Sequence, residues 1–183
     1  MQHFYDAIIS EKTNDKTDLY LMIDDDRITS GVSIYKDEFP DIDVPIRLVA
    51  TNLVSPFREL DFPAAGCPEI VSEDLKMLIT DLGEYDNIEF LPAYVANVQV
   101  KKKYYLLKFL KTESDLVDLE RSKYVMLGEE KQLIVPFFKK EVEVKYHIFK
   151  VDEIKYWLFV SEKFKREFKK RKLVGCDFYK RTF

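Results

Sequence analysis

The most reactive cluster in this sequence is a run of three aspartates, Asp24, Asp25 and Asp26. Adjacent carboxylates can hold a hard divalent cation such as Ca²⁺ or Mg²⁺. A solvated turn between two strands, ending at Gly31, is the commoner role for such a run. We expect no bound metal here or elsewhere, because His3 and His147 stand alone in the sequence, without other ligands at metal-binding spacing.

Other catalytic signatures are missing from the sequence. There are only five glycines, and no phosphate-binding glycine pattern occurs. Cys67 and Cys176 match no zinc or redox spacing. Asp115, Asp118 and Arg121 are best explained by a loop or short helix that makes its own hydrogen bonds and ion pairs. We therefore expect a protein that is not an enzyme and that has no cofactor. An enzyme built around Asp24 to Asp26 or around the Asp115 region is kept as an alternative.

Length and composition favour a single packed domain over residues 1–183. Hydrophobic residues make up 46% of the chain and aromatic residues 14%, which is too apolar for a disordered protein. No uncharged apolar run approaches the length of a membrane span, so we expect no membrane partner. Two cysteines are too few for a disulfide framework, and a cytoplasmic location is expected.

The formal charge is divided unevenly along the chain. Residues 1–90 carry a net charge of −13, and residues 91–183 carry +9. Such a division indicates either two parts of the chain that attract each other or two surfaces for different partners. The sequence leaves both alternatives open.

Strand-like stretches dominate the chain, because β-branched and aromatic residues are frequent and several segments alternate with period two. The clearest alternation lies in 141–151, where we expect a half-buried strand with His147 on its polar face, closed into a hairpin at 152–154. The other predicted strands are 4–10, 19–23, 46–50, 94–100, 103–110, 132–138 and 155–160.

A repeat supplies the best predicted helices. The stretch 69–92 reappears in altered form as 158–180, with Val-Ser-Glu at 71–73 and again at 160–162, an offset of 89. Ser72 and Ser161 are good N-caps, and the apolar residues that follow each serine recur at helical spacing. Each copy then reads strand, helix, return strand, with Phe90 matching Phe178 at an offset of 88. The expected fold is α+β, a mostly antiparallel sheet with two related strand-helix-strand units.

The second predicted helix is strongly basic. The run 162–173 contains seven lysines and arginines and could attract nucleic acid. Phe164 and Phe168, however, share one stripe of the helix, as in an ordinary amphipathic surface helix. A nucleic-acid-binding module is therefore kept as an alternative function, with nucleic acid an unlikely partner.

Several segments, taken in order, resemble a known family. They are LVSPFREL (53–60), IVSEDLKMLITDL (70–82), IEFLPAYV (88–95), YYLLKFLKTESDLVDLERSKY (104–124) and HIFKVDEIKYWLFVSEKFKREFKKRKLVGCDF (147–178). In content and order they are similar to the bacterial polymorphic-toxin immunity proteins of immunity family eleven. The resemblance implies a non-catalytic protein that binds and neutralises a cognate toxin domain.

If the chain is an immunity protein, its densest acidic segment is the first candidate for the toxin-binding surface. A toxin that attacks nucleic acid must itself be basic to hold phosphates, so an acidic surface would attract it and cover its site. A nuclease-like toxin is the expected partner. The alternative is that these carboxylates solvate a loop or pair with the basic half of the chain. The candidate residues are Asp24, Asp25, Asp26, Asp37, Glu38, Asp41 and Asp43.

Overall fold

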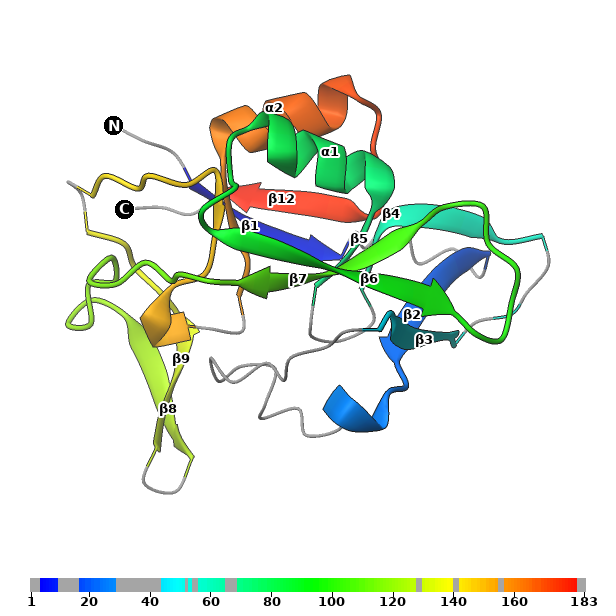
Figure 1. The fold of residues 1–183 in the computed structure, drawn as a ribbon. Helices are drawn as coiled ribbons and strands as arrows, with labels where there is room; N and C mark the ends of the chain where they lie inside the picture. Colours follow the sequence, from blue (N-terminus) through cyan, green and yellow to red (C-terminus); the bar gives the residue numbers. More distant parts are fainter. Residues whose placement is uncertain are drawn as a thin grey trace.

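The computed structural model describes residues 4–9, 17–28, 44–51, 53, 56–64, 69–127, 130–139, 142–154 and 157–180. Figure 1 shows the strands and the two helices. The helices are α1 (Glu73–Asp81) and α2 (Glu162–Lys170), and two short 3₁₀ helices are η2 (Asp26–Ile28) and η3 (Asp152–Ile154). The strands are β1 (Phe4–Ile9), β2 (Asp18–Ile23), β3 (Ile46–Ala50), β4 (Arg58–Ala64), β5 (Ile70–Ser72), β6 (Ile88–Val95), β7 (Tyr104–Phe109), β8 (Lys123–Leu127), β9 (Glu130–Val135), β10 (Ile148–Phe149), β11 (Phe159–Ser161) and β12 (Cys176–Lys180).

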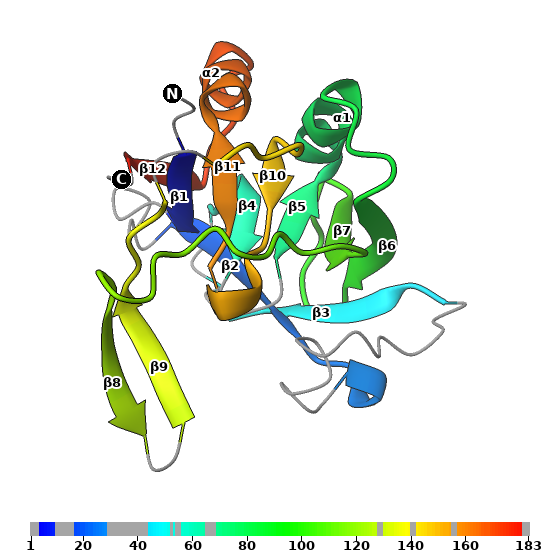
Figure 2. The same cartoon turned by 90° about the vertical axis from the view of Figure 1, so that its left-hand side faces the viewer.

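Two sheets contain most of these strands. One has the order β4-β2-β3-β6-β7-β5 and the other β10-β11-β1-β12, while β8 and β9 form a separate hairpin. The pairs β2–β4 and β3–β6 are parallel, and the other pairs within the described chain are antiparallel. The helices α1 and α2 lie next to each other on the same side of the sheets (Figure 2). The predicted α+β class is confirmed.

The repeated sequence forms two units of the same topology. In the first, β5 leads into α1 and then β6, and β7 lies between β5 and β6, antiparallel to both. In the second, β11 leads into α2 and then β12, and the inserted antiparallel strand is β1. The first unit therefore takes its middle strand from the next segment of the chain, whereas the second takes it from the N-terminal segment.

The register on the inserted strand is the same in both units. Each cap serine faces one residue of that strand, and the aromatic residue of the return strand faces the residue three positions further on. The pairs are Ser72–Tyr104 and Phe90–Leu107 in the first unit, and Ser161–Phe4 and Phe178–Ala7 in the second. Phe90 and Phe178 thus occupy equivalent positions, as the sequence alignment of the two copies predicts.

Both helices begin at the predicted caps. Ser72 has φ −74° and ψ 167°, and Ser161 has φ −78° and ψ 164°. The Ser72 hydroxyl accepts from the Leu75 N–H at 3.3 Å, and that of Ser161 accepts from the Phe164 N–H at 3.2 Å. Each serine therefore satisfies one of the backbone donors that a helix start leaves without a partner.

The helices also end alike. Gly83 has φ 89° and Lys172 has φ 57°, again at an offset of 89. The Lys172 N–H donates to Lys169 O at 3.0 Å, and the Leu173 N–H donates to Phe168 O at 3.2 Å, which is the Schellman pattern. The left-handed conformation is natural for glycine and costs energy for lysine, so this ending is set by the shared unit geometry as well as by the local residue.

A polar trio recurs beside each helix. A tyrosine of the inserted strand hydrogen-bonds the first glutamate of the helix, and a lysine one turn later lies over the tyrosine ring. The trios are Tyr105, Glu73 and Lys76, with 3.9 Å from the lysine Nζ to the ring centroid, and Tyr5, Glu162 and Lys165, with 3.6 Å. The hydrogen bond to Glu162 raises the pKa of Tyr5 to about 12. Each trio fixes the helix on its middle strand.

The two units share one apolar core. Helix α1 contributes Leu75, Leu78 and Ile79, and α2 contributes Phe164 and Phe168. Strand residues of both units complete this cluster, among them Tyr5, Ala7, Val71, Ile88, Leu107 and Val160. The predicted assignment of Phe164 and Phe168 to the core is confirmed, since each is 3% exposed.

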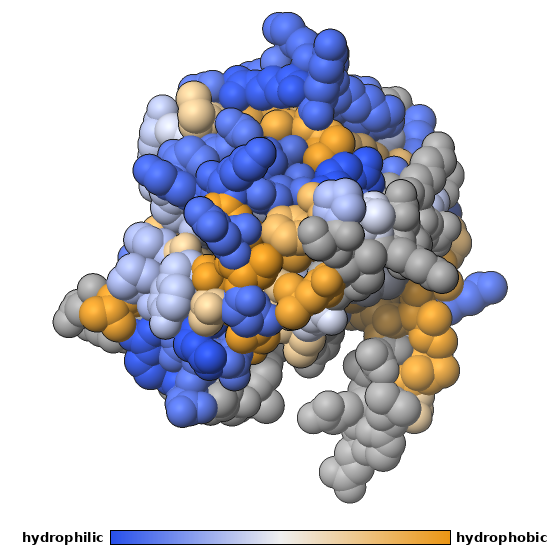
Figure 3. Space-filling model, turned by 90° about the vertical axis from the view of Figure 1, so that its right-hand side faces the viewer, coloured by the Kyte–Doolittle hydropathy of each residue, from blue (hydrophilic) through white to orange (hydrophobic). Residues whose placement is uncertain are grey.

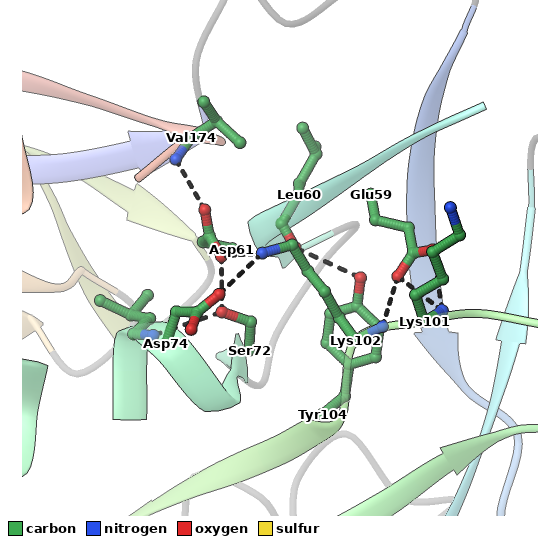
Figure 4. A network of polar contacts seen from close by, with 10 residues as sticks. Glu59, Leu60, Asp61, Ser72, Asp74, Lys101, Lys102, Tyr104 and Val174 are labelled. Carbon is green, nitrogen blue, oxygen red and sulfur yellow. Dashed lines mark hydrogen bonds and ion pairs between the residues drawn. The ribbon is translucent and has the colours of Figure 1, made fainter. Parts of the chain in front are cut away.

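A buried carboxylate joins the two units at one end (Figure 4). Asp61 on β4 accepts from the Ser72 hydroxyl at 2.6 Å, from Lys102 Nζ at 2.7 Å and from the Val174 N–H at 2.9 Å. Lys102 also contacts Asp74 at 3.0 Å. Asp61 therefore connects the α1 cap, the β6–β7 connection and the α2–β12 loop.

The α2–β12 loop lies directly against β4. Gly175 has φ 106°, and a Cβ at this position would lie 2.7 Å from Phe62 O. Only glycine allows this backbone approach without displacement, because both the positive φ and the close contact exclude a side chain.

The predicted strand 141–151 is largely wrong. Its alternating burial is present, with Val144 and Tyr146 buried and Lys145 exposed, but only Ile148–Phe149 pairs as a strand. The His147 N–H donates to a side chain, Glu84 Oε1, at 2.6 Å instead of to a neighbouring strand. Alternation of apolar and polar residues indicates that one side of a segment is buried, but it does not indicate whether a partner strand lies beside that segment.

The other predicted strands have boundary errors. In the predicted strand 94–100, only residues up to Val95 are strand, as the end of β6. In the predicted strand 155–160, the observed strand β11 begins at Phe159. Strands β4 and β8 were not predicted. The connection 152–154 forms η3, and β10 and β11 pair as the predicted hairpin.

Glu84 and Asn87 form a buried polar contact between the α1–β6 connection and the start of β10. Asn87 Nδ2 donates to Ile148 O at 3.1 Å. Neither Glu84 Oε2 nor Asn87 Oδ1 has a hydrogen-bond partner among the described residues. Burial raises the pKa of Glu84, and the His147 N–H and the Asn87 side chain only partly oppose that rise.

We expect Glu84→Gln to stabilise the protein at pH 7 by about 1 kcal/mol, because the neutral amide removes a buried charge and adds donors where an acceptor lacks a partner. A carboxyl whose folded pKa is raised destabilises the fold as pH rises from its unfolded pKa through its folded pKa. The gain should therefore shrink below the unfolded value of about 4.3. Urea unfolding of both proteins from pH 3 to 8 checks this, and a gain independent of pH would contradict it.

Candidate functional site

The acidic run lies at the corner where β2 ends and η2 begins. Asp25 is 8% exposed, and its carboxylate accepts from Arg27 Nε at 2.7 Å and from the Arg47 N–H at 3.1 Å. The hydrogen bonds from Arg27 hold the pKa of Asp25 well below its usual range. Asp25 therefore shapes this corner, and its carboxylate has little surface to offer a partner.

The neighbouring aspartates are more accessible. Asp24 is about half exposed and pairs with Arg47, whose side chain is 47% exposed. Asp26 is exposed at the first residue of η2. The other four candidates, Asp37, Glu38, Asp41 and Asp43, lie outside the described residues. The structure thus places two of the seven predicted residues on accessible surface and assigns one to the fold.

The acidic and basic halves of the chain do pair with each other in the described part. Seven ion pairs join residues 1–90 to residues 91–183. They are Asp61–Lys102, Asp74–Lys102, Glu89–Lys108, Asp86–Lys111, Asp86–Lys145, Glu69–Lys150 and Asp81–Arg171. Only Asp81–Arg171 among them links α1 directly to the C-terminal end of α2, whereas Asp74–Lys102 and Glu89–Lys108 lie within the first unit. The pairs of Asp24 and Asp25 instead lie within the first half.

One of these pairs is buried. The Lys150 side chain is 7% exposed and that of Glu69 is 10% exposed, and Lys150 Nζ donates to Glu69 Oε1. The backbone carbonyls of the same two residues also accept hydrogen bonds. The Leu107 N–H donates to Glu69 O within the larger sheet, and the Glu113 N–H donates to Lys150 O. Lys150 belongs to a motif that the sequence singled out, but a buried ion pair could not be foreseen from it.

The other candidate chemical groups have structural surroundings. His147 is half-buried, which corrects the expectation of an exposed strand histidine, and its Nδ1 lies 2.9 Å from the Ser161 hydroxyl. Burial, with help from Lys163, lowers the pKa of His147. Burial also raises the pKa of the free thiol of Cys176. In the described ranges, no three His, Cys, Asp or Glu side chains gather as metal ligands would.

The polar stretch 114–122 makes its own contacts, as predicted. The Arg121 N–H donates to Asp118 Oδ1 at 3.1 Å, and the Ser122 hydroxyl donates to Asp118 O at 2.6 Å. Asp115 pairs with Lys139. These contacts stabilise a loop.

Two further surfaces could meet a partner. The β8–β9 hairpin projects from the body of the molecule (Figures 1 and 2) and exposes large apolar side chains, namely Tyr124, Val125, Met126, Ile134 and Val135. Helix α2 exposes basic side chains, including Lys163, Arg166, Lys169 and Lys170, opposite its buried phenylalanines. The sequence pattern predicted the basic surface of α2 but did not predict the apolar surface of the β8–β9 hairpin.

The comparison with protein families decides the broad identity. The model of the Imm11 immunity protein family matches residues 3–182. This chain belongs to the Imm11 family. The resemblance identified from ordered motifs is thereby confirmed, and the match extends beyond the region that those motifs cover. Comparison with curated proteins found no match. In the described part of this Imm11 protein, neither helix has the length and apolar character needed to cross a membrane.

Proposed function

We propose that this immunity protein neutralises a cognate bacterial toxin domain by binding it, without catalysis. The observation that carries the proposal is the match to the Imm11 family over residues 3–182. The described residues support it, because their polar clusters are occupied by structural contacts while apolar and charged surfaces remain open. Immunity by occlusion requires only a stable, complementary surface.

We further propose that the acidic segment 24–43 attracts a basic, nuclease-like toxin. It contains seven acidic residues and two basic ones, a net charge of −5. A nuclease must bind phosphates through basic side chains, so an opposite charge would accelerate association and cover the active site. In this proposal Asp24, Asp26, Asp37, Glu38, Asp41 and Asp43 meet the toxin. Asp25 acts indirectly, by holding Arg27 and the start of β3 in place.

We propose the cytoplasm of the toxin-producing cell as the place of action. The thiol of Cys176, which is half-buried and forms no disulfide among the described residues, is compatible with a reducing compartment. A toxin released there would meet the immunity protein before its target.

Co-expression with the toxin encoded by the adjacent reading frame tests the function. The wild-type chain should restore growth, and the purified proteins should associate at a rate that falls steeply with salt. Neutralising Asp37, Glu38, Asp41 and Asp43 to their amides should slow association by about tenfold or more at low salt. The matched control is Glu120→Gln with Glu143→Gln, two exposed carboxylates outside the segment.

The outcomes separate the two parts of the proposal. A salt-insensitive rate, or full protection by the neutralised variant, would remove the acidic segment from the mechanism and leave the immunity role intact. Failure of the wild-type chain to protect against this toxin would reject neutralisation itself.

A further inference from the structure

The helix side of the larger sheet is covered over only part of its area. Phe90 on β6 packs in the core beneath α1, where Lys76 Nζ lies 5.8 Å from its ring centroid. Successive residues of a strand alternate between faces, so Pro92 and Tyr94 continue the same face beyond the helix. Both are exposed, and Tyr94 is 49% exposed.

The neighbouring strands extend this open face. Tyr94 faces Arg47 on β3, and the next outward residue of β3, Val49, faces Met22 on β2. Met22 is 46% exposed. We call the set Met22, Arg47, Val49, Pro92 and Tyr94 the docking face. Tyrosine, methionine and arginine are the residue types enriched where proteins bind each other.

A hollow lies beside Tyr94. The end of β6, the β6–β7 connection and the start of β7 line an open hollow of about 420 Å³. Its lining includes Pro92, Tyr94 and Val95 of β6 and Val98, Val100 and Lys103 of the connection. Figure 3 views the molecule from the side of this connection and shows apolar side chains across its middle, bordered by hydrophilic ones. An apolar group of a partner could enter this hollow with Tyr94 packed against it.

Charge at the edge of the docking face specifies the chemistry of the partner. Arg47 is paired with Asp24, and Arg27 is paired with Asp25. These two arginines are thus neutralised, while Lys103 on the far side of the hollow is exposed. With Arg47 included, residues 24–47 carry a net charge of −4 in the sequence. A partner that fits is therefore basic around an apolar centre.

Resting on the proposed function, we infer that the docking face is the toxin-binding surface, with Tyr94 as its central anchor. The toxin contributes an apolar group to the hollow beside Tyr94, and its surrounding basic residues meet Asp24 and Asp26 after the end of β2. Desolvated aromatic anchors at the centre of an interface carry most of the binding energy, whereas the charged rim mainly sets the association rate.

Binding of the purified toxin domain encoded beside this gene tests the inference. Tyr94→Ala should weaken the affinity roughly tenfold or more, mainly through faster dissociation, and Met22→Ala should weaken it less. The matched control is Tyr85→Ala, since Tyr85 is a tyrosine outside the docking face that is 73% exposed. Its affinity should stay within about twofold of wild type. Thermal unfolding of all variants verifies that each is folded.

Toxin binding through the β8–β9 hairpin would give a different set of variant affinities. If Met126→Ser on the β8–β9 hairpin abolishes binding while Tyr94→Ala and Met22→Ala leave it unchanged, the docking face is wrong and the proposed function stands. If the wild-type chain does not bind the toxin domain, the proposed function fails and this inference fails with it.

Discussion

Replacing Lys150 by methionine should lower the free energy of unfolding by about 3–5 kcal/mol, because Glu69 would remain buried without its counter-charge. Both side chains are almost inaccessible to water, and they tie the segment after β10 to the segment before β5. Methionine keeps the length of the side chain, so the loss reports charge and not volume. Urea unfolding at pH 7 measures it.

A double variant separates the charge from the packing. Lys150→Met combined with Glu69→Leu should recover most of the lost stability, since apolar replacement of a whole buried pair is often neutral. Lys108→Met is the control, because Lys108 pairs with the 46%-exposed Glu89 and such pairs contribute about 0–1 kcal/mol. A loss below about 1 kcal/mol for Lys150→Met would show that the Lys150–Glu69 pair contributes no more than an exposed ion pair.

Phe168→Ala should cost about 3–5 kcal/mol, because the ring fills the core shared by the two units. Its centroid lies 5.2 Å from that of Phe178 and 6.2 Å from that of Phe164. The neighbouring Lys169→Ala, on the exposed side of α2, is the control and should change stability little. Thermal unfolding checks both. Unchanged stability with lost toxin binding would mean that the helix face is a binding surface.

The predictable part of the fold is the part fixed by local signals. A serine before an acidic residue and a helical apolar stripe are sufficient to place the starts of α1 and α2. The paired offsets of 89 and 88 anticipated the equivalence of Phe90 and Phe178, because a repeated sequence keeps its register. These features need no knowledge of distant segments.

The missed features depend on distant segments. Nothing near Phe4 indicates that β1 will be the middle strand of the second unit, since its partners lie more than 150 residues away. The segment before Ile148 alternates like a strand, but Glu84 takes the backbone N–H of His147 that a partner strand would need. Pairing, unlike alternation, is decided by tertiary structure.

The candidate site likewise has a part that local sequence predicts and a part that depends on tertiary structure. Charge density selected Asp24 to Asp26, but it could not distinguish the Arg27-bound Asp25 from its accessible neighbours. The docking face was not predicted, because Met22, Arg47 and Tyr94 come from three strands and meet only through sheet register. Sequence charge indicated a kind of partner, and the fold supplies a surface for it.

Neutralisation by binding is tested most directly by the activity of the purified toxin domain as this protein is added. Toxin activity should fall in proportion to the protein added and be abolished when the two form a stoichiometric complex that elutes as one species. Full toxin activity in the presence of excess folded protein would contradict it.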